Sequence, residues 1–215
     1  MLGFSKIHRA ERGDTLIEVL FAITVFSFIV VASLNLMNQG VAASQRSMEI
    51  TTVRQQMDGQ AEVLRFLHES YVDAYQPGTA TYTPGTPAAE YQKIIAFAKA
   101  SGRTSASEFN GGGTTCTVPS DPARDFILNP VSATLVTSSI NPAVFEKAPI
   151  FAQLTYGSGN VLEKSQGLWV EAVRSTENGS SAGYIDFHIR ACWDVPGTDI
   201  PMNLGTIVRL YEPRG

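Results

Sequence analysis

The sequence is poor in cysteine and histidine, which supply many catalytic and metal-binding side chains. Its 215 residues contain two cysteines, Cys116 and Cys192, and three histidines. His188 lies four residues before Cys192, but no CxxC or HxxH spacing accompanies it, so the pattern does not indicate a zinc site. Neither His68 nor His188 stands in a recognisable nucleophile motif. We therefore expect a protein that is not an enzyme and that has no catalytic residue, no metal ligand and no cofactor.

The sequence also lacks the motifs of calcium and nucleotide sites. Its aspartates after residue 120 are scattered, and no EF-hand loop is present. They include Asp121, Asp125, Asp186 and Asp194. Gly111-Gly112-Gly113 has no Walker lysine and no preceding strand, so we interpret it as a loop. Asn178-Gly179-Ser180 matches a glycosylation sequon, but Asn-Gly is first a hairpin turn, which is the interpretation we favour.

Positive charge is scarce as well. The chain carries 16 Lys and Arg against 20 Asp and Glu, which gives a net charge of −4. Without residues 1–13 it would keep 13 basic and 19 acidic residues, a net charge of −6. Nucleic-acid affinity depends on Lys and Arg side chains that release counterions from phosphate. The charge balance therefore disfavours a nucleic-acid partner.

A long charge-free stretch lies close to the N-terminus. No Asp, Glu, Lys or Arg occurs between Glu18 and Arg46, and the part from Val19 to Leu36 is strongly apolar. About 20 such residues span a bilayer core, so we predict a transmembrane helix. A carboxylate at the edge of such a span is costly and indicates function, which singles out Glu18. The basic residues precede the span, so the remainder of the chain is predicted to lie outside the cytoplasm.

The residues around Glu18 resemble the class III signal of type IV prepilins and pseudopilins. The segment reads Arg12-Gly13-Asp14-Thr15-Leu16-Ile17-Glu18-Val19-Leu20, and the resemblance covers about the first 50 residues. It implies that a prepilin peptidase cuts after Gly13. It also implies that Thr15, Leu16 and Ile17 belong to the assembly core, in which Glu18 pairs with the N-terminal amine of a neighbouring subunit. Asp14 departs from the usual phenylalanine or methionine, which leaves N-methylation of that residue undecided.

Two other interpretations of the N-terminus remain open. An ordinary secretory signal is cut after its apolar region at a small-residue site. Ala32-Ser33 imitates such a site without a clean A-x-A pattern. An uncleaved single-span anchor is the other alternative.

The resemblance to prepilins also bears on the kind of subunit. Asn35 stands where major pilins often carry a proline, which favours a minor subunit.

Periodicity predicts one long helix followed by a mixed domain. Asp14–Tyr75 reads as a helix of roughly 90 Å at 1.5 Å per residue, and its second half is amphipathic. A globular domain cannot bury so long a rod, so the helix is predicted to cross a membrane or to lie in a polymer. A short helix is predicted over Ala88–Ser101. Strands are predicted over Phe126–Thr137, Ile150–Tyr156, Leu168–Arg174, Tyr184–Asp194 and Thr206–Glu212, with the last three forming an antiparallel meander.

These elements predict an α+β protein in which the long helix packs on a C-terminal antiparallel sheet, similar to the pilin fold. We expect a leader over 1–13, a transmembrane and polymerisation helix over 14–45, and an extracytoplasmic head over 46–215. Two cysteines outside the membrane favour a disulfide between Cys116 and Cys192, although two separate buried thiols are the alternative.

The predicted function is that of a minor pilin, a structural subunit of a type IV pilus that serves attachment or motility. Its partners would be the membrane, other pilin subunits, the prepilin peptidase and the pilus assembly machinery. The chain would lie in the cytoplasmic membrane before assembly and in an extracellular filament afterwards. Two alternatives remain: a pseudopilin of a type II secretion or DNA-uptake system, and a single-span surface adhesin or receptor.

Overall fold

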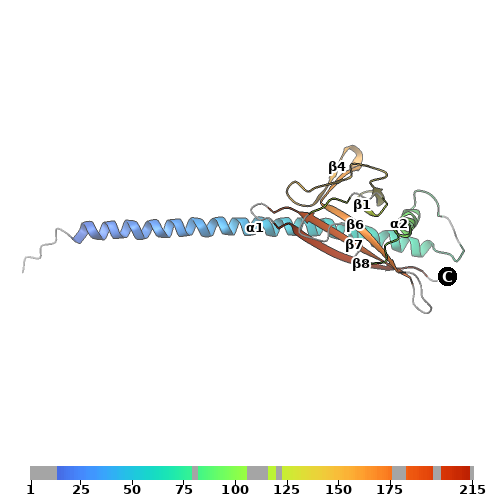
Figure 1. Ribbon diagram of the computed structural model, residues 1–215, viewed down its shortest axis with the longest axis horizontal. Coiled ribbons are helices and arrows are strands. Elements are labelled where there is room, and N and C mark those ends of the chain that lie inside the picture. The colour runs from blue at the N-terminus through green and yellow to red at the C-terminus, as the bar shows by residue number, and fades with distance from the viewer. Residues whose placement is uncertain are drawn as a thin grey trace, which may run out of the picture. The chain divides into compact units, whose positions relative to one another are not determined.

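The computed structural model describes residues 14–78, 82–105, 116–119, 123–175, 183–195 and 200–213. It is an α+β protein with a long N-terminal helix and a C-terminal antiparallel sheet (Figure 1), as predicted. The chain divides into two compact units between Met48 and Glu49. The predicted boundaries of leader, polymerisation helix and head remain predictions.

Helix α1 (Asp14–Ala74) is continuous over 61 residues, which confirms the predicted long helix. No proline interrupts the sequence before Pro77, and a proline inside a helix removes a hydrogen bond and breaks the helix. After Ala74 the chain turns, and Gly78 adopts a positive φ of 85°, a conformation that glycine tolerates without strain.

The second half of α1 buries one face against the sheet. Its buried residues recur at steps of three and four: Val53, Met57, Ala61, Leu64 and Leu67. They share one hydrophobic cluster with Ile185, Phe187 and Ile189 of the sheet. The predicted packing of that strand face on the amphipathic half of the helix is therefore confirmed.

Helix α2 (Pro87–Ser101) carries start and stop signals at its ends. The Thr86 hydroxyl accepts a hydrogen bond from the Ala89 amide at 3.3 Å, and Pro87 occupies the first turn. Gly102 closes the helix in the left-handed region, with φ of 63°. These are the residue types that helix termini favour, and they explain why the predicted helix forms.

The main sheet has five strands in the order β2-β1-β6-β7-β8, all paired antiparallel. Its members are β1 (Asp125–Asn129), β2 (Thr134–Thr137), β6 (Leu168–Ser175), β7 (Tyr184–Trp193) and β8 (Met202–Tyr211). Strands β6, β7 and β8 form the predicted meander, and β8 begins four residues before the predicted start. The region predicted as one strand over 126–137 is instead a hairpin, because β1 and β2 pair with each other around a turn.

A smaller sheet has the order β3-β5-β4. Its strands are β3 (Phe145–Glu146), β5 (Leu162–Gln166) and β4 (Gln153–Tyr156). Only β4 was predicted from the sequence. Strand β3 is two residues long and β5 reads LEKSQ, so neither shows the period-two alternation from which strands are predicted.

The buried side chain of Gln60 joins α1 to the sheet. Its amide nitrogen donates to the Leu128 carbonyl at 2.8 Å, and the Leu128 amide donates to its carbonyl oxygen at 2.9 Å. The pairing of β1 with β6 extends only over Asp125 and Phe126. Gln60 therefore supplies the two hydrogen bonds that a neighbouring strand would have given to Leu128.

Candidate functional site

The first half of α1 exposes every described side chain. Residues 15–48 are all exposed, although the helix reaches a mean hydropathy of 2.5 over its most apolar stretch. The exposed side chains are large and apolar on all sides, among them Leu16, Leu20, Phe21, Phe26, Phe28, Ile29, Val31, Leu34 and Met37. Within the described residues, this is the one helix that is long and apolar enough to cross a membrane.

The predicted assembly residues lie in the first turns of α1. Thr15, Leu16, Ile17 and Glu18 are consecutive helical residues, and Leu16 and Ile17 are each 69% exposed. Gly13 and the side chain of Asp14 lie outside the described residues, so the predicted cleavage site remains a prediction.

The two cysteines form a disulfide, as predicted. Cys116 and Cys192 are bonded across 76 residues of sequence, with a Cα–Cα distance of 5.5 Å. The bond attaches residues 116–119 to β7. Closing a loop of this length restricts the unfolded chain and contributes about 4 kcal/mol to stability in the chain-entropy model.

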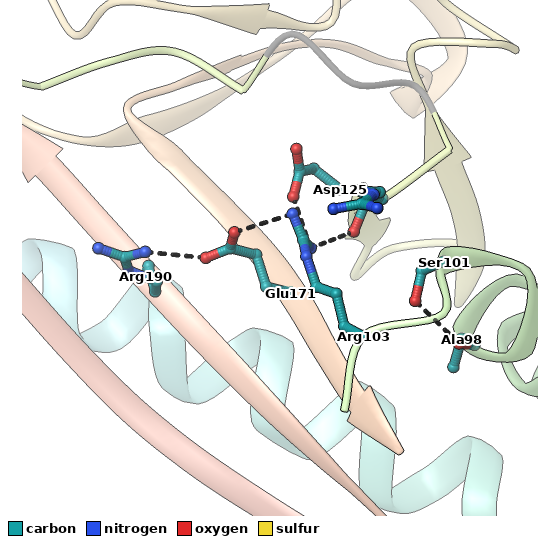
Figure 2. Close-up of polar contacts among 7 residues, drawn as sticks. Ala98, Ser101, Arg103, Asp125, Glu171 and Arg190 are labelled. Carbon is teal, nitrogen blue, oxygen red and sulfur yellow. Dashed lines mark hydrogen bonds and ion pairs between the residues drawn. The ribbon is translucent and has the colours of Figure 1, made fainter. Parts of the chain in front are cut away.

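A buried charge network was not predicted from the sequence (Figure 2). Arg103 follows α2, and its side chain is fully buried between two fully buried carboxylates. Its Nη1 atom lies 3.0 Å from Oδ1 of Asp125 and donates to the Arg124 carbonyl at 2.7 Å. Its Nη2 atom lies 3.3 Å from Oε1 of Glu171.

The network continues into β7. Arg190 donates to Oε2 of Glu171 at 2.9 Å and places its guanidinium 5.5 Å from the centre of the Trp169 ring. Two positive and two negative groups therefore balance each other in the interior. Removing one partner of such a pair commonly costs about 3–5 kcal/mol, because a charge is left buried. The network ties the segment after α2 to β1, β6 and β7, while the disulfide ties residue 116 to β7.

Sequence reasoning missed this network because its members are far apart in the chain. Asp125 and Glu171 are direct cross-strand partners, an arrangement that is unfavourable for two like charges unless a cation lies between them. The one available signal was Glu171 within the otherwise apolar LWVEAV of β6. A strand that is buried on both faces leaves no solvated position for that carboxylate.

His68 and His188 lie in the part of the chain that the structure describes. His68 Nε2 lies 2.9 Å from the Tyr211 carbonyl oxygen. His188 is half-buried, and this burial lowers its pKa, although the carboxylates of Asp186 and Glu171 oppose the shift. Among the described residues, no group of three His, Cys, Asp or Glu side chains is arranged to hold a metal ion.

Comparison with protein-family models, curated proteins and solved structures finds no match to this chain. The architecture itself is pilin-like. An apolar N-terminal helix continues into a segment packed on a C-terminal antiparallel sheet, and a disulfide closes the domain. The apolar helix and the disulfide together indicate a membrane or extracellular location.

Proposed function

We propose that the protein is a minor pilin, a non-enzymatic subunit of an extracytoplasmic type IV pilus that contributes to attachment or motility. The prepilin peptidase would cut after Gly13. The assembly machinery would then move the chain from the cytoplasmic membrane into the filament, where other pilin subunits surround α1.

One observation carries this proposal: one face of the second half of α1 is buried by the protein's own head, whereas the first half is exposed. Leu64 is fully buried by the chain itself, whereas Leu20 on the same helix is 55% exposed. Burying apolar surface contributes about 25 cal/mol for each Å² that is removed from water, so the exposed apolar stretch from Val19 to Leu36 calls for an apolar environment supplied from outside the chain. A bilayer supplies it first, and a bundle of neighbouring helices supplies it afterwards.

Glu18 gives the assembled state its polarity and register. A charge in an apolar bundle is strongly disfavoured unless an opposite charge pairs with it. Cleavage after Gly13 creates a new amine, and the amine of a neighbouring subunit is the counter-ion that the resemblance to prepilins implies. Pairing of this kind is possible at one axial offset between helices, so it selects that offset during assembly.

The proposal is tested by Glu18→Ala, with Glu62→Ala as the matched control on the same helix. Glu62 is an exposed residue that pairs with Arg65 at 2.5 Å, and exposed pairs of this kind contribute little to stability. We expect Glu18→Ala to reach the membrane at normal abundance and to be missing from sheared surface fibres, while Glu62→Ala enters them. Normal incorporation of Glu18→Ala would refute the proposed role of the carboxylate.

Processing is tested separately by Gly13→Ala. Intact mass spectrometry should find an uncleaved chain for this variant and a chain that lacks residues 1–13 for the wild type. If the wild type is recovered from surface fibres, a membrane-resident adhesin or receptor is excluded. If it is cleaved but confined to the cell envelope in a strain that makes pili, the pseudopilin alternative is favoured instead.

A further inference from the structure

Four polar side chains mark one face of the exposed half of α1. They are Thr24, Ser27, Asn35 and Asn38. Eleven residues make about three helical turns, so Thr24 lies in line with Asn35, and Ser27 lies in line with Asn38. Asn35 and Asn38 are three residues apart and are therefore neighbours on the helix surface. All four side chains are exposed.

The hydroxyl groups and the amide of Asn35 differ in how they are satisfied. Thr24 donates to the Phe21 carbonyl at 2.7 Å, and Ser27 donates to the Ile23 carbonyl at 2.8 Å. These groups need no further partner in an apolar environment. The Asn35 side chain makes no hydrogen bond to any described residue, although an amide carries two donor hydrogens and an acceptor oxygen.

The position of Asn35 decides when this amide needs a partner. Asn35 lies 17 residues after Glu18, which is about 25 Å along a helix. The hydrocarbon core of a bilayer is about 30 Å thick, so with Glu18 at the inner boundary Asn35 lies near the outer headgroups, where water is available. In a helical bundle the same residue is surrounded by other helices.

We propose that Asn35, supported by Asn38, is a hydrogen-bonding anchor to a polar side chain on the apolar helix of a neighbouring filament subunit. This inference rests on the proposed function and adds a second contact point to it. Glu18 fixes one end of the apolar segment by charge pairing, and Asn35 fixes the other end by hydrogen bonding. In the bundle the amide loses its access to water and headgroups, so its partner there is a polar side chain on a neighbouring helix.

The chemistry favours a role in selecting the neighbour. An asparagine in an otherwise apolar helix interface specifies register and partner, since a misaligned neighbour leaves the amide unsatisfied. Subunits with an apolar side chain at the matching depth would be disfavoured beside this one. The polar face thus gives the subunit a preferred place among its neighbours.

The test uses the full-length chain in cells that assemble fibres. The measurement is the ratio of chain in sheared fibres to chain in membranes for Asn35→Leu, Asn35→Gln and Thr24→Val. Asn35→Leu leaves the neighbour's polar group without a partner, so we expect its ratio to fall about three- to tenfold with membrane abundance unchanged. Thr24→Val removes a hydroxyl that the helix already satisfies, so its ratio should stay within about twofold of the wild type. Asn35→Gln keeps the amide and should recover most of the loss.

The outcomes separate this inference from the proposed function. If wild-type chain is missing from fibres, the proposed function fails. If wild-type chain is present and Asn35→Leu enters fibres equally well, the anchor is refuted while the filament role stands. The anchor is also refuted if Thr24→Val falls as far as Asn35→Leu, because the effect is then not specific to the Asn35 amide. It is refuted as well if Asn35→Gln falls as far, because shape rather than hydrogen bonding then explains the effect. Buried-tryptophan fluorescence of each variant checks that the head is folded.

Discussion

The two halves of α1 share one helical geometry and differ in where the partners of their side chains come from. In residues 49–74 one face is apolar, and the protein's own sheet covers it. In residues 15–48 every described side chain is exposed, and the part from Val19 to Leu36 is predominantly apolar. The spacing of apolar residues along a helix, together with its composition, therefore distinguishes a helix that completes a domain from one that depends on a membrane or on other chains.

Polar groups show the same contrast. In the head, Gln60 is satisfied by the Leu128 backbone, and Arg103 lies between Asp125 and Glu171. In the exposed half of α1, Glu18 has no ion-pair partner among the described residues. A domain that folds by itself has to satisfy its buried polar groups internally, whereas a helix that assembles with others leaves some of them for its neighbours.

Loss of the disulfide should have the largest effect, and it should act on the head alone. We expect a double variant, Cys116→Ser with Cys192→Ser, to lose about 4 kcal/mol of unfolding free energy. The measurement is urea unfolding of the full chain in mild detergent, followed by tryptophan fluorescence. Trp169 and Trp193 are both buried in the head, so the signal reports that unit. An unchanged midpoint would contradict the stabilising role of the bond.

A matched pair of leucines tests the contrast between the two halves directly. Leu64→Ala removes a fully buried side chain and should lower the unfolding free energy of the head by about 3 kcal/mol. Leu20→Ala removes a side chain of the exposed half and should leave that free energy unchanged. The same urea titration measures both variants. Equal destabilisation would mean that the head depends on the exposed half.

Gln60 tests how α1 is joined to the sheet. Gln60→Leu leaves the amide and carbonyl of Leu128 buried without these two hydrogen bonds, and we expect a loss of about 2 kcal/mol. Gln60→Glu keeps an acceptor for the Leu128 amide but removes the donor to its carbonyl, so it separates the two contacts. A Leu variant as stable as the wild type would show that other groups or water satisfy Leu128.

The smallest effect concerns His188. Because burial lowers its pKa in the folded head, the unfolded chain takes up a proton at a higher pH than the folded chain does. Stability from this group is therefore present above the ordinary histidine pKa of about 6.5 and declines as the pH falls through that range. His188→Gln should flatten the pH dependence of the unfolding free energy between about pH 7.5 and about pH 5.5. An unchanged slope would contradict the shift.

Much of the fold followed from the sequence because its signals are local. The length and apolarity of α1 and the alternation in β6, β7 and β8 all lie within short windows. Strands β3 and β5 did not follow, because they are short or polar and depend on pairing with each other. The same reason hid the hairpin of β1 and β2.

The candidate sites also divide into those with a local sequence signal and those that only the folded chain brings together. Glu18 is conspicuous because a carboxylate next to a charge-free apolar run is rare, and two cysteines leave a single possible intramolecular pair. Arg103, Asp125 and Glu171 come from three separate segments, so only the folded chain brings them together. Gln60 reads as one more polar residue of an amphipathic helix until the edge of β1 is seen beside it.

The most direct measurement is N-terminal sequencing of the chain recovered from sheared surface fibres. A polymerisation helix predicts that the fibre-associated protein begins at Asp14, with residues 15–48 retained. If the chain instead begins at Met1 and is found in the membrane fraction and never in fibres, the exposed half of α1 is a simple anchor and the filament assignment is wrong.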